Sequence, residues 1–231
     1  MTKTFLGAAL SLFIAGTAIA QNKKQETLEG NGNVVTREVS VQPFTALKAS
    51  GVYELKLVQG PGEGVKIEAD ENLQELFEVK NDGSQLVISM KEMKNKNLKT
   101  KNKMRVYVTF KTLKSMELST VGNVTTDNTL NFDDLDLRTT SVGNVNLKLT
   151  AEKLSLENKS VGDVSLSGTA SDVVVRNNGV GSLHAASFVV QTMDIDNSGV
   201  GSAEVNAEKS LKVKDSFLGK VSNKGAAPVR K

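Results

Sequence analysis

The sequence repeats itself every 18 to 20 residues from Leu113 onward, and no other feature limits the possible folds as strongly. An apolar-x-apolar pair recurs six times, with steps of 19, 19, 19, 20 and 18 residues between second members: Met116/Leu118, Leu135/Leu137, Leu154/Leu156, Val173/Val175, Met193/Ile195 and Leu211/Val213. A unit of two short strands without a helix cannot bury its apolar side chains alone, whereas stacked units can. The repeat therefore predicts an all-β chain with a parallel β-solenoid over residues 113–223.

A polar corner follows each pair and carries a Val-Gly or Leu-Gly dipeptide, as in SVGNV at 141–145 and SVGDV at 160–164. Glycine adopts positive φ freely and allows a neighbouring backbone to approach closely. We therefore expect these glycines to set the tight turns of the solenoid, and we expect the preceding Val or Leu to fill the core behind each turn. The structural corner glycines are Gly122, Gly143, Gly162, Gly181, Gly201 and Gly219.

Two polar columns accompany the corners. One follows the glycines and the other precedes the corners: Asn123, Asn144, Asp163, Ser182, Ser202 and Lys220 in the first, Asn158, Asn177 and Asn197 in the second. Stacked amides can form hydrogen-bonded ladders, and these residue types also suit tight turns. Calcium needs several converging oxygen ligands, and the first column holds one acidic residue. We therefore expect a structural role for both columns.

Residues 29–112 show the period-two alternation of β-strands, interrupted by turn residues. The expected strands cover 34–41, 52–59, 65–70, 85–91 and 104–110. One short helix is expected over 71–77, with Asp70 as its N-cap, because apolar residues recur there at helical spacing. The first half is therefore predicted to be strand-rich with one brief helical interruption.

The first twenty residues have the pattern of a secretory signal peptide. Lys3 precedes a short apolar run, and Ala18-Ile19-Ala20 forms a small-residue cleavage site, so the mature chain is expected to span 21–231. The sequence contains no Cys, which excludes disulfides and a lipid-modified cysteine. No later segment is apolar enough to predict a membrane span after cleavage. We expect an exported protein that is not a lipoprotein.

Composition argues against several functional classes. The formal net charge of +3 falls to +2 without Lys3, which gives no general attraction for nucleic acid. With one histidine, His184, expected to face solvent, and no Cys, neither a metal nor a cofactor is expected. The alternative of a glycan-active β-helix enzyme would need two carboxylates facing one cleft. Asp133, Asp134 and Asp136 lie close together but are expected to point outward.

The segment KEMKNKNLKTKNKMR, residues 91–105, is the one strong charge cluster, with seven basic residues against one Glu. We expect a solvated loop between two strands. Such a loop could attract anionic envelope polymers by electrostatic interactions that salt weakens. The candidate ligand-binding residues are Lys94, Lys96, Lys99, Lys101 and Lys103.

The stretches FTALKASGVYELKLVQGPGEGVKIEADENL (44–73) and RVYVTFKTLKSMELSTVGNV (105–124), with the later Val-Gly corners, resemble the DUF2807 family, the head GIN domain of auto-transporter adhesins. The resemblance covers nearly the whole mature chain and implies one β-helix-like GIN domain in an exported protein of Bacteroidota-type bacteria. It brings no catalytic residue. We therefore expect a non-enzymatic, adhesin-like or structural module of the periplasm or cell surface, with an envelope protein or a surface glycan as partner.

Overall fold

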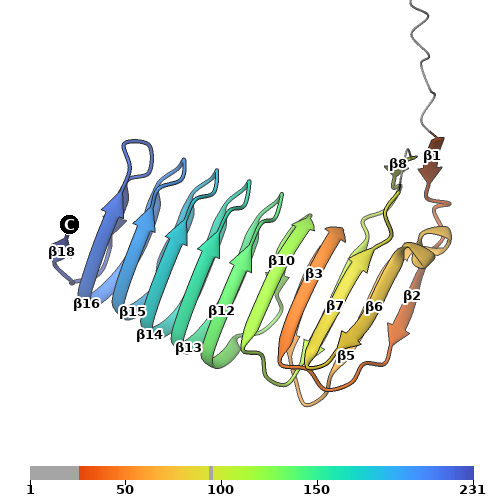
Figure 1. Cartoon of the computed structure of the whole chain (residues 1–231), viewed down its shortest axis with the longest axis horizontal. Coiled ribbons are helices and arrows are strands. Elements are labelled where there is room, and N and C mark those ends of the chain that lie inside the picture. The colour runs from red at the N-terminus through yellow and green to blue at the C-terminus, as the bar shows by residue number, and fades with distance from the viewer. Residues whose placement is uncertain (1–25, 94–95) are drawn as a thin grey trace, which may run out of the picture.

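A computed structural model describes residues 26–93 and 96–231, so the expected signal peptide and Lys94 lie outside the described residues. One sheet of sixteen strands coils into a solenoid, and a separate two-stranded sheet lies beside its N-terminal end (Figure 1). The predicted all-β solenoid is confirmed.

The first half of the described chain forms short strands and one 3-10 helix. These elements are β1 (Glu26–Glu29), β2 (Val34–Val39), β3 (Ala46–Val52), β4 (Glu54–Gln59), β5 (Gly64–Asp70), η1 (Glu71–Leu76), β6 (Phe77–Asp82), β7 (Gln85–Met90), β8 (Lys96–Lys99) and β9 (Arg105–Phe110).

The second half forms the regular turns of the solenoid. Its strands are β10 (Ser115–Val121), β11 (Val124–Thr126), β12 (Leu130–Thr139), β13 (Val145–Asn158), β14 (Val164–Asn177), β15 (Leu183–Asn197), β16 (Ala203–Asp215), β17 (Val221–Asn223) and β18 (Val229–Arg230). From β13 to β16, the two short strands expected for each repeat are joined into one long strand. Each long strand bends around the core, so the expected break between the two short strands is absent there.

Successive turns pair in parallel, and the apolar pairs of the repeat lie on one another. Leu156 pairs with Val175, and Val175 pairs with Ile195. The register of β15 shifts against both neighbouring strands, which absorbs the 20- and 18-residue steps of the sequence repeat. Such bulges add or remove residues locally without breaking the stack.

The stack also extends into the first half of the chain, in an order that differs from the sequence. β3 lies between β10 and β7 with parallel pairing on both sides, and β4 lies in the same way between β11 and β9. Antiparallel strands close this end, since β6 pairs with β7, and β5 pairs with β9 and β2. The sequence-level repeat therefore begins later than the structural stack.

The core is a continuous apolar column inside the turns. In β13 the side chains of Val145, Leu147 and Leu149 point inward, and after the bend Leu154 and Leu156 do so. Each fully buried leucine stabilises the fold by about 1.5–3 kcal/mol relative to an exposed one. Stability is therefore distributed along the stack, with each turn burying the apolar side of the next.

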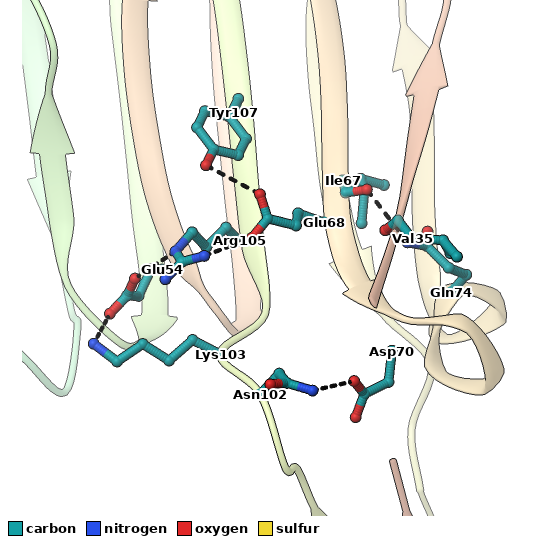
Figure 2. A network of polar contacts seen from close by, with 10 residues as sticks. All are labelled: Val35, Glu54, Ile67, Glu68, Asp70, Gln74, Asn102, Lys103, Arg105 and Tyr107. Atoms are coloured by element: carbon teal, nitrogen blue, oxygen red, sulfur yellow. Dashed lines mark hydrogen bonds and ion pairs between the residues drawn. The ribbon is translucent and has the colours of Figure 1, made fainter. Parts of the chain in front are cut away.

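The helix differs from the prediction in type and in its cap. It is a 3-10 helix, and Asp70 makes no side-chain capping hydrogen bond. The Asp70 side chain is buried at the end of β5, and its Oδ1 accepts a hydrogen bond of 2.8 Å from Asn102 Nδ2 instead. Gln74 ties the helix to its neighbours by donating to the carbonyls of Val35 and Ile67 (Figure 2).

The corner residues differ from the prediction more substantially, because the valine before each glycine does not fill the core. Val142, Val161 and Val180 are 51–53% exposed. The residue before each of the first two, Ser141 or Ser160, is fully buried. Alternating side-chain direction then places the valine outside. The corner therefore has a polar interior and an apolar exterior.

Five of the six predicted corner glycines adopt positive φ, between 125° and 144°: Gly122, Gly143, Gly162, Gly181 and Gly201. Gly219 does not adopt positive φ, because the last corner is a wider loop in which Gly219 N donates to Ser216 O. A side chain is excluded there by close packing instead, since an added Cβ would lie 2.5 Å from Asn197 O.

Replacement of Gly162 by Ala is expected to destabilise the protein. The residue has φ of 125°, and its Cβ would lie 2.4 Å from the backbone oxygen of Gly143. Strain of this type costs about 1–3 kcal/mol before the clash is added. Urea unfolding should show this loss for Gly162→Ala. The control Gly62→Ala, at a site with no atom within 4 Å and no positive φ, should change little; equal stability of the two variants would contradict the role assigned to the corner.

Candidate functional site

The asparagine column that precedes the corners lies inside the solenoid. Asn158 Nδ2 donates to Asn177 Oδ1 at 2.7 Å, and Asn177 Nδ2 donates to Asn197 Oδ1 at 2.5 Å. All three residues are buried. A buried amide without a partner would cost about 1–3 kcal/mol, so the ladder satisfies groups that the fold places inside. The predicted amide ladder is confirmed, and its role is structural.

The column that follows the glycines lies outside and binds the backbone of the next turn. Asn123 Oδ1 accepts from Asn144 N at 3.1 Å, Asn144 Oδ1 accepts from Asp163 N at 3.1 Å, and Asp163 Oδ1 accepts from Ser182 N at 2.8 Å. These side chains therefore serve the turns, as the sequence predicted.

A row of exposed valines runs between these two polar columns along the corners, which form the upper edge of the solenoid in Figure 1. Parallel pairing aligns the members of the row. Leu218 continues the row, because its carbonyl accepts from Gly201 N as the carbonyl of Val200 accepts from Gly181 N. We call this row the valine ridge: Val52, Val121, Val142, Val161, Val180, Val200 and Leu218.

A shallow hollow of about 440 Å³ lies on the face of the solenoid formed by the residues that come after the ridge residue in each turn. One side of it is formed by the row Thr125, Asn146, Ser165 and His184, which lie in register across four turns. Lys148 is the one lysine or arginine among its lining residues. We call this hollow the polar groove; it presents hydroxyl, amide and imidazole groups at the spacing of neighbouring strands, about 4.8 Å.

His184 faces solvent, as predicted, and its side chain is about half exposed. Its Nε2 lies 3.7 Å from Asp163 Oδ2 on the preceding turn. Ser165 lies opposite it on the preceding turn, and Glu204 lies opposite it on the next turn.

Three of the five predicted lysine candidates, Lys99, Lys101 and Lys103, lie beside carboxylates. Lys94 lies outside the described residues, and Lys96 begins β8, which pairs with β1 where a solvated loop was expected. Lys99 and Lys101 lie 3.3 and 3.9 Å from the carboxylate oxygens of Glu29, and Lys103 lies 2.6 Å from Glu54. The segment is therefore a short strand followed by a turn, with part of its positive charge balanced.

Glu54 also belongs to a larger polar network on the outer face of β4, β5 and β9 (Figure 2). Arg105 bridges Glu54 at 3.2 Å and Glu68 at 2.5 Å, and Tyr107 donates to Glu68 at 3.3 Å. The hydrogen bond from Lys103 is the main reason why the pKa of Glu54 is lowered, and the bond to Glu68 raises the pKa of Arg105. These groups cross-link the three strands.

Tyr107 would be the obvious stacking platform for a sugar, but cations cover its ring. Lys66 Nζ lies 4.3 Å from the ring centroid, and Lys56 Nζ lies 5.5 Å from it. Cation–π contacts of this type stabilise the local surface. The ring is therefore engaged within the protein, on a surface of mixed charge.

The acidic cluster of β12 points outward, as predicted. Asp133 and Asp134 are exposed, and Asp136 lies 3.4 Å from Arg138. Asp136 shares a hollow of about 200 Å³ with Glu117, which pairs with Lys48 at 2.9 Å. Glycoside hydrolysis needs one carboxyl group that its surroundings keep protonated. Both of these side chains are nearly half exposed, and each lies beside a basic side chain.

Within 26–93 and 96–231, no group of three or more His, Asp or Glu side chains is arranged to hold a metal ion. Over the same ranges, no helix has the length and apolar character that a bilayer span requires.

The family model described as "Putative auto-transporter adhesin, head GIN domain" matches residues 43–227. The chain therefore belongs to the DUF2807 family, as its sequence motifs suggested. Among curated proteins, no sequence matches this chain.

Solved structures share the fold over most of the chain. A "putative adhesin" of Bacteroides fragilis NCTC 9343 is 27% identical, with a TM-score of 0.75 over 87% of this chain and 98% of its own. A "putative lipid binding protein" of Parabacteroides distasonis ATCC 8503 is 17% identical, with a TM-score of 0.63 over 88% and 98%. A "putative adhesin" of the same strain is 20% identical, with a TM-score of 0.61 over 89% and 95%. The last two show the fold alone.

Two surfaces were therefore not identified from the sequence as candidate sites. The valine ridge had a clear signal, a valine before nearly every corner glycine, but the prediction placed it inside. The polar groove had a weaker signal, the polar middle residues Asn146, Ser165 and His184 of the second strand in each repeat. Short polar residues at such positions are ordinary on an outward face, so the pattern alone did not indicate a site.

Removal of the Glu54 charge is expected to reduce stability in a pH-dependent way. The pKa of Glu54 is lowered from its ordinary 4.5 in the folded state, so its contribution is present above about pH 4.5 and is lost as the pH falls through the lowered value. Glu54→Gln should therefore cost at most about 1 kcal/mol at pH 7 and less at pH 3. Urea unfolding at both pH values measures this, with exposed Glu38→Gln as control. An equal loss at both pH values would contradict the charge-based explanation.

Proposed function

We propose that this protein is an exported, non-enzymatic binding module of the cell envelope, and that its ligand is a neutral surface glycan held along the polar groove. The observation that carries the proposal is the alignment of Thr125, Asn146, Ser165 and His184 across four turns in one hollow. The family is described as an adhesin domain, and membership of it supports a binding role.

The chemistry of the groove suits an uncharged, hydroxyl-rich polymer. The side chains of the row from Thr125 to His184 both donate and accept hydrogen bonds, and they recur at the strand spacing of about 4.8 Å. An extended saccharide chain also presents hydroxyl groups at regular intervals. Each hydrogen bond contributes only about 0.5–1.5 kcal/mol, and no Phe, Tyr or Trp lines the groove, so affinity at one site should be modest. Adhesion then depends on many such sites acting together.

Binding without catalysis follows from the same surface. The groove's lining contains no Asp or Glu. The pair Glu117 and Asp136 lies in another hollow, where each carboxylate contacts a base. A glycan in the groove would therefore be retained rather than cleaved.

Export is part of the proposal. The signal-peptide pattern of residues 1–20, the cleavage site after Ala20 and the absence of Cys support a mature protein of 21–231 in the periplasm or at the cell surface. A stack held without disulfides can fold in either compartment, because its stability comes from the apolar interior.

The basic segment supports a second candidate function, the binding of anionic envelope polymers. Lys99 and Lys101 share the single carboxylate of Glu29, and their side chains are more than half exposed. The β1–β8 sheet that carries Lys99 is separate from the main sheet and lies at the N-terminal end of the stack (Figure 1). An excess of positive charge therefore remains accessible at this end.

The groove is tested with purified protein on an array of neutral oligosaccharides of hexose and N-acetylhexosamine, with acidic oligosaccharides beside them, at physiological salt. The protein should be retained on a subset of the neutral chains. Ser165→Arg places a long charged side chain in the groove and should reduce this retention at least about tenfold, the loss of one or two hydrogen bonds.

The matched control is Ser155→Arg, which introduces the same side chain at an exposed position on the opposite face of the same strand pair. It should leave retention unchanged. Absence of retention on every neutral oligosaccharide, or equal retention by both variants, would refute the groove as the binding site.

The second candidate is tested on heparin beads. Substitution of Lys99, Lys101 and Lys103 by Gln should lower the salt concentration at which the protein elutes, because fewer counterions are released on binding. The control replaces three exposed lysines elsewhere with the same loss of charge: Lys114, Lys153 and Lys209. If both triple variants elute together, general charge is responsible, and the basic segment is not a site.

A further inference from the structure

We propose that the valine ridge is the contact surface between two copies of this chain, which associate side by side with their solenoid axes parallel. This inference goes beyond the proposed function, because it involves another face and needs no glycan. It rests on four observations: the concentration of exposed apolar residues, their spacing, the charges beside them and the size of the surface.

Exposed apolar side chains are concentrated on this one edge. In the part of the chain that the structure describes, eight of the eleven exposed large hydrophobic residues are the seven ridge residues and the adjacent Phe217, which is 92% exposed. Scattered apolar residues on a surface need no explanation, but a contiguous row indicates an interaction site. A polar residue such as Ser or Thr could adopt the same backbone conformation at this corner. The turn geometry therefore does not explain why valine recurs here.

The spacing of the ridge indicates what can cover it. Neighbouring strands lie about 4.8 Å apart, so seven rungs present an apolar side chain at each step over about 29 Å. A partner that contacts every valine must have the same repeat. A second copy of this solenoid has the same repeat, and its own exposed valines would be buried by the same contact.

Charges beside the ridge determine the orientation of the two copies. At the five corners from Val121 to Val200, the side chains two positions before and after the valine are neutral in every turn but one. In the turn of Val161 they are Lys159 on one flank and Asp163 on the other. Lys159 is exposed, and its Nζ lies 2.6 Å from Glu157 on the same strand.

A two-fold axis parallel to the ridge brings each rung against the same rung of the partner and reverses the flanks. Lys159 of each copy then faces Asp163 of the other. The hydroxyl and amide flanks from Val121 to Val200 face one another, and at the ends Glu54 faces Ser50 and Lys220 faces Ser216. A two-fold axis perpendicular to the ridge at Val161 would place Lys159 against Lys159 and Asp163 against Asp163, and at the two ends it would place Glu54 against Lys220. Glu54 already pairs with Lys103 at 2.6 Å and with Arg105 at 3.2 Å in its own chain, so the central like-charge contacts weigh more. Opposite charges attract and like charges repel, so the parallel pair is favoured.

The size of the surface sets the strength of the association. The ridge is about 29 Å long and about three side chains wide, which is at the small end of specific interfaces. We therefore expect a reversible dimer with a dissociation constant in the micromolar range or weaker. Sedimentation velocity of the purified protein should accordingly show a sedimentation coefficient that rises with concentration.

The absence of Cys from the sequence allows a direct test of contact and orientation. Single-cysteine variants Val121→Cys, Val161→Cys and Val200→Cys are treated with a short dimaleimide cross-linker. Each site is about half exposed, so the substitution should not disturb folding. In the parallel dimer each ridge position meets its own copy, so all three variants should cross-link with themselves well above the level of a control.

The control is Val174→Cys, which is 41% exposed on a broad face away from the ridge. Cross-linking of Val161→Cys alone, together with preferential cross-linking between Val121→Cys and Val200→Cys in a mixture, would show an antiparallel pair and overturn the proposed arrangement. Cross-linking at the control level for all three positions would overturn the interface itself. Neither result depends on glycan binding, so the two proposals can fail separately.

Discussion

The close approach of successive turns at each corner is the constraint on which the rest of the structure depends. Gly143 N donates to Val161 O at 3.0 Å, and Gly162 N donates to Val180 O at 2.8 Å, so the corners themselves are joined by backbone hydrogen bonds. This contact leaves no room for a Cβ, which explains the glycine. It also fixes the register of everything beside it, because a slip of one residue would turn every side chain to the other face.

The corner also reverses the usual distribution of polar and apolar residues. Ser160 is buried while Val161 is exposed, and the buried hydroxyl groups satisfy one another, as Thr139 Oγ1 and Ser160 Oγ do at 2.9 Å. Such a reversal does not add to the stability of a single solenoid. Departures from the ordinary hydrophobic pattern are expected at functional sites, and this edge is such a departure.

The fold could be predicted from the sequence where neighbours in sequence are also neighbours in space. Between β12 and β16 each turn follows the last, so the period was visible, and the glycine and asparagine columns followed from it. In the first half, the helix and the antiparallel strands interrupt the turns and hide the period. The exposure of Val161 could not be predicted, because the valine beside a glycine resembles a core residue until the inward direction of Ser160 is known. The ion pairs of Lys99 and Lys103 join residues 70 and 49 positions apart, which no local pattern indicates.

The interleaved order of the first turns has a consequence for folding. The turn formed by β3 and β4 is synthesised before both of its neighbours, since β7 and β9 lie on one side of it and β10 and β11 on the other. Before residue 85 is made, this turn has no strand to pair with, and its second side stays unpaired until β10 and β11 follow. The consecutive turns from β12 to β16 make contacts at shorter separation in sequence, and contacts of that kind form fastest. The solenoid is therefore expected to nucleate in its C-terminal half and to complete its N-terminal end last, against the order of synthesis.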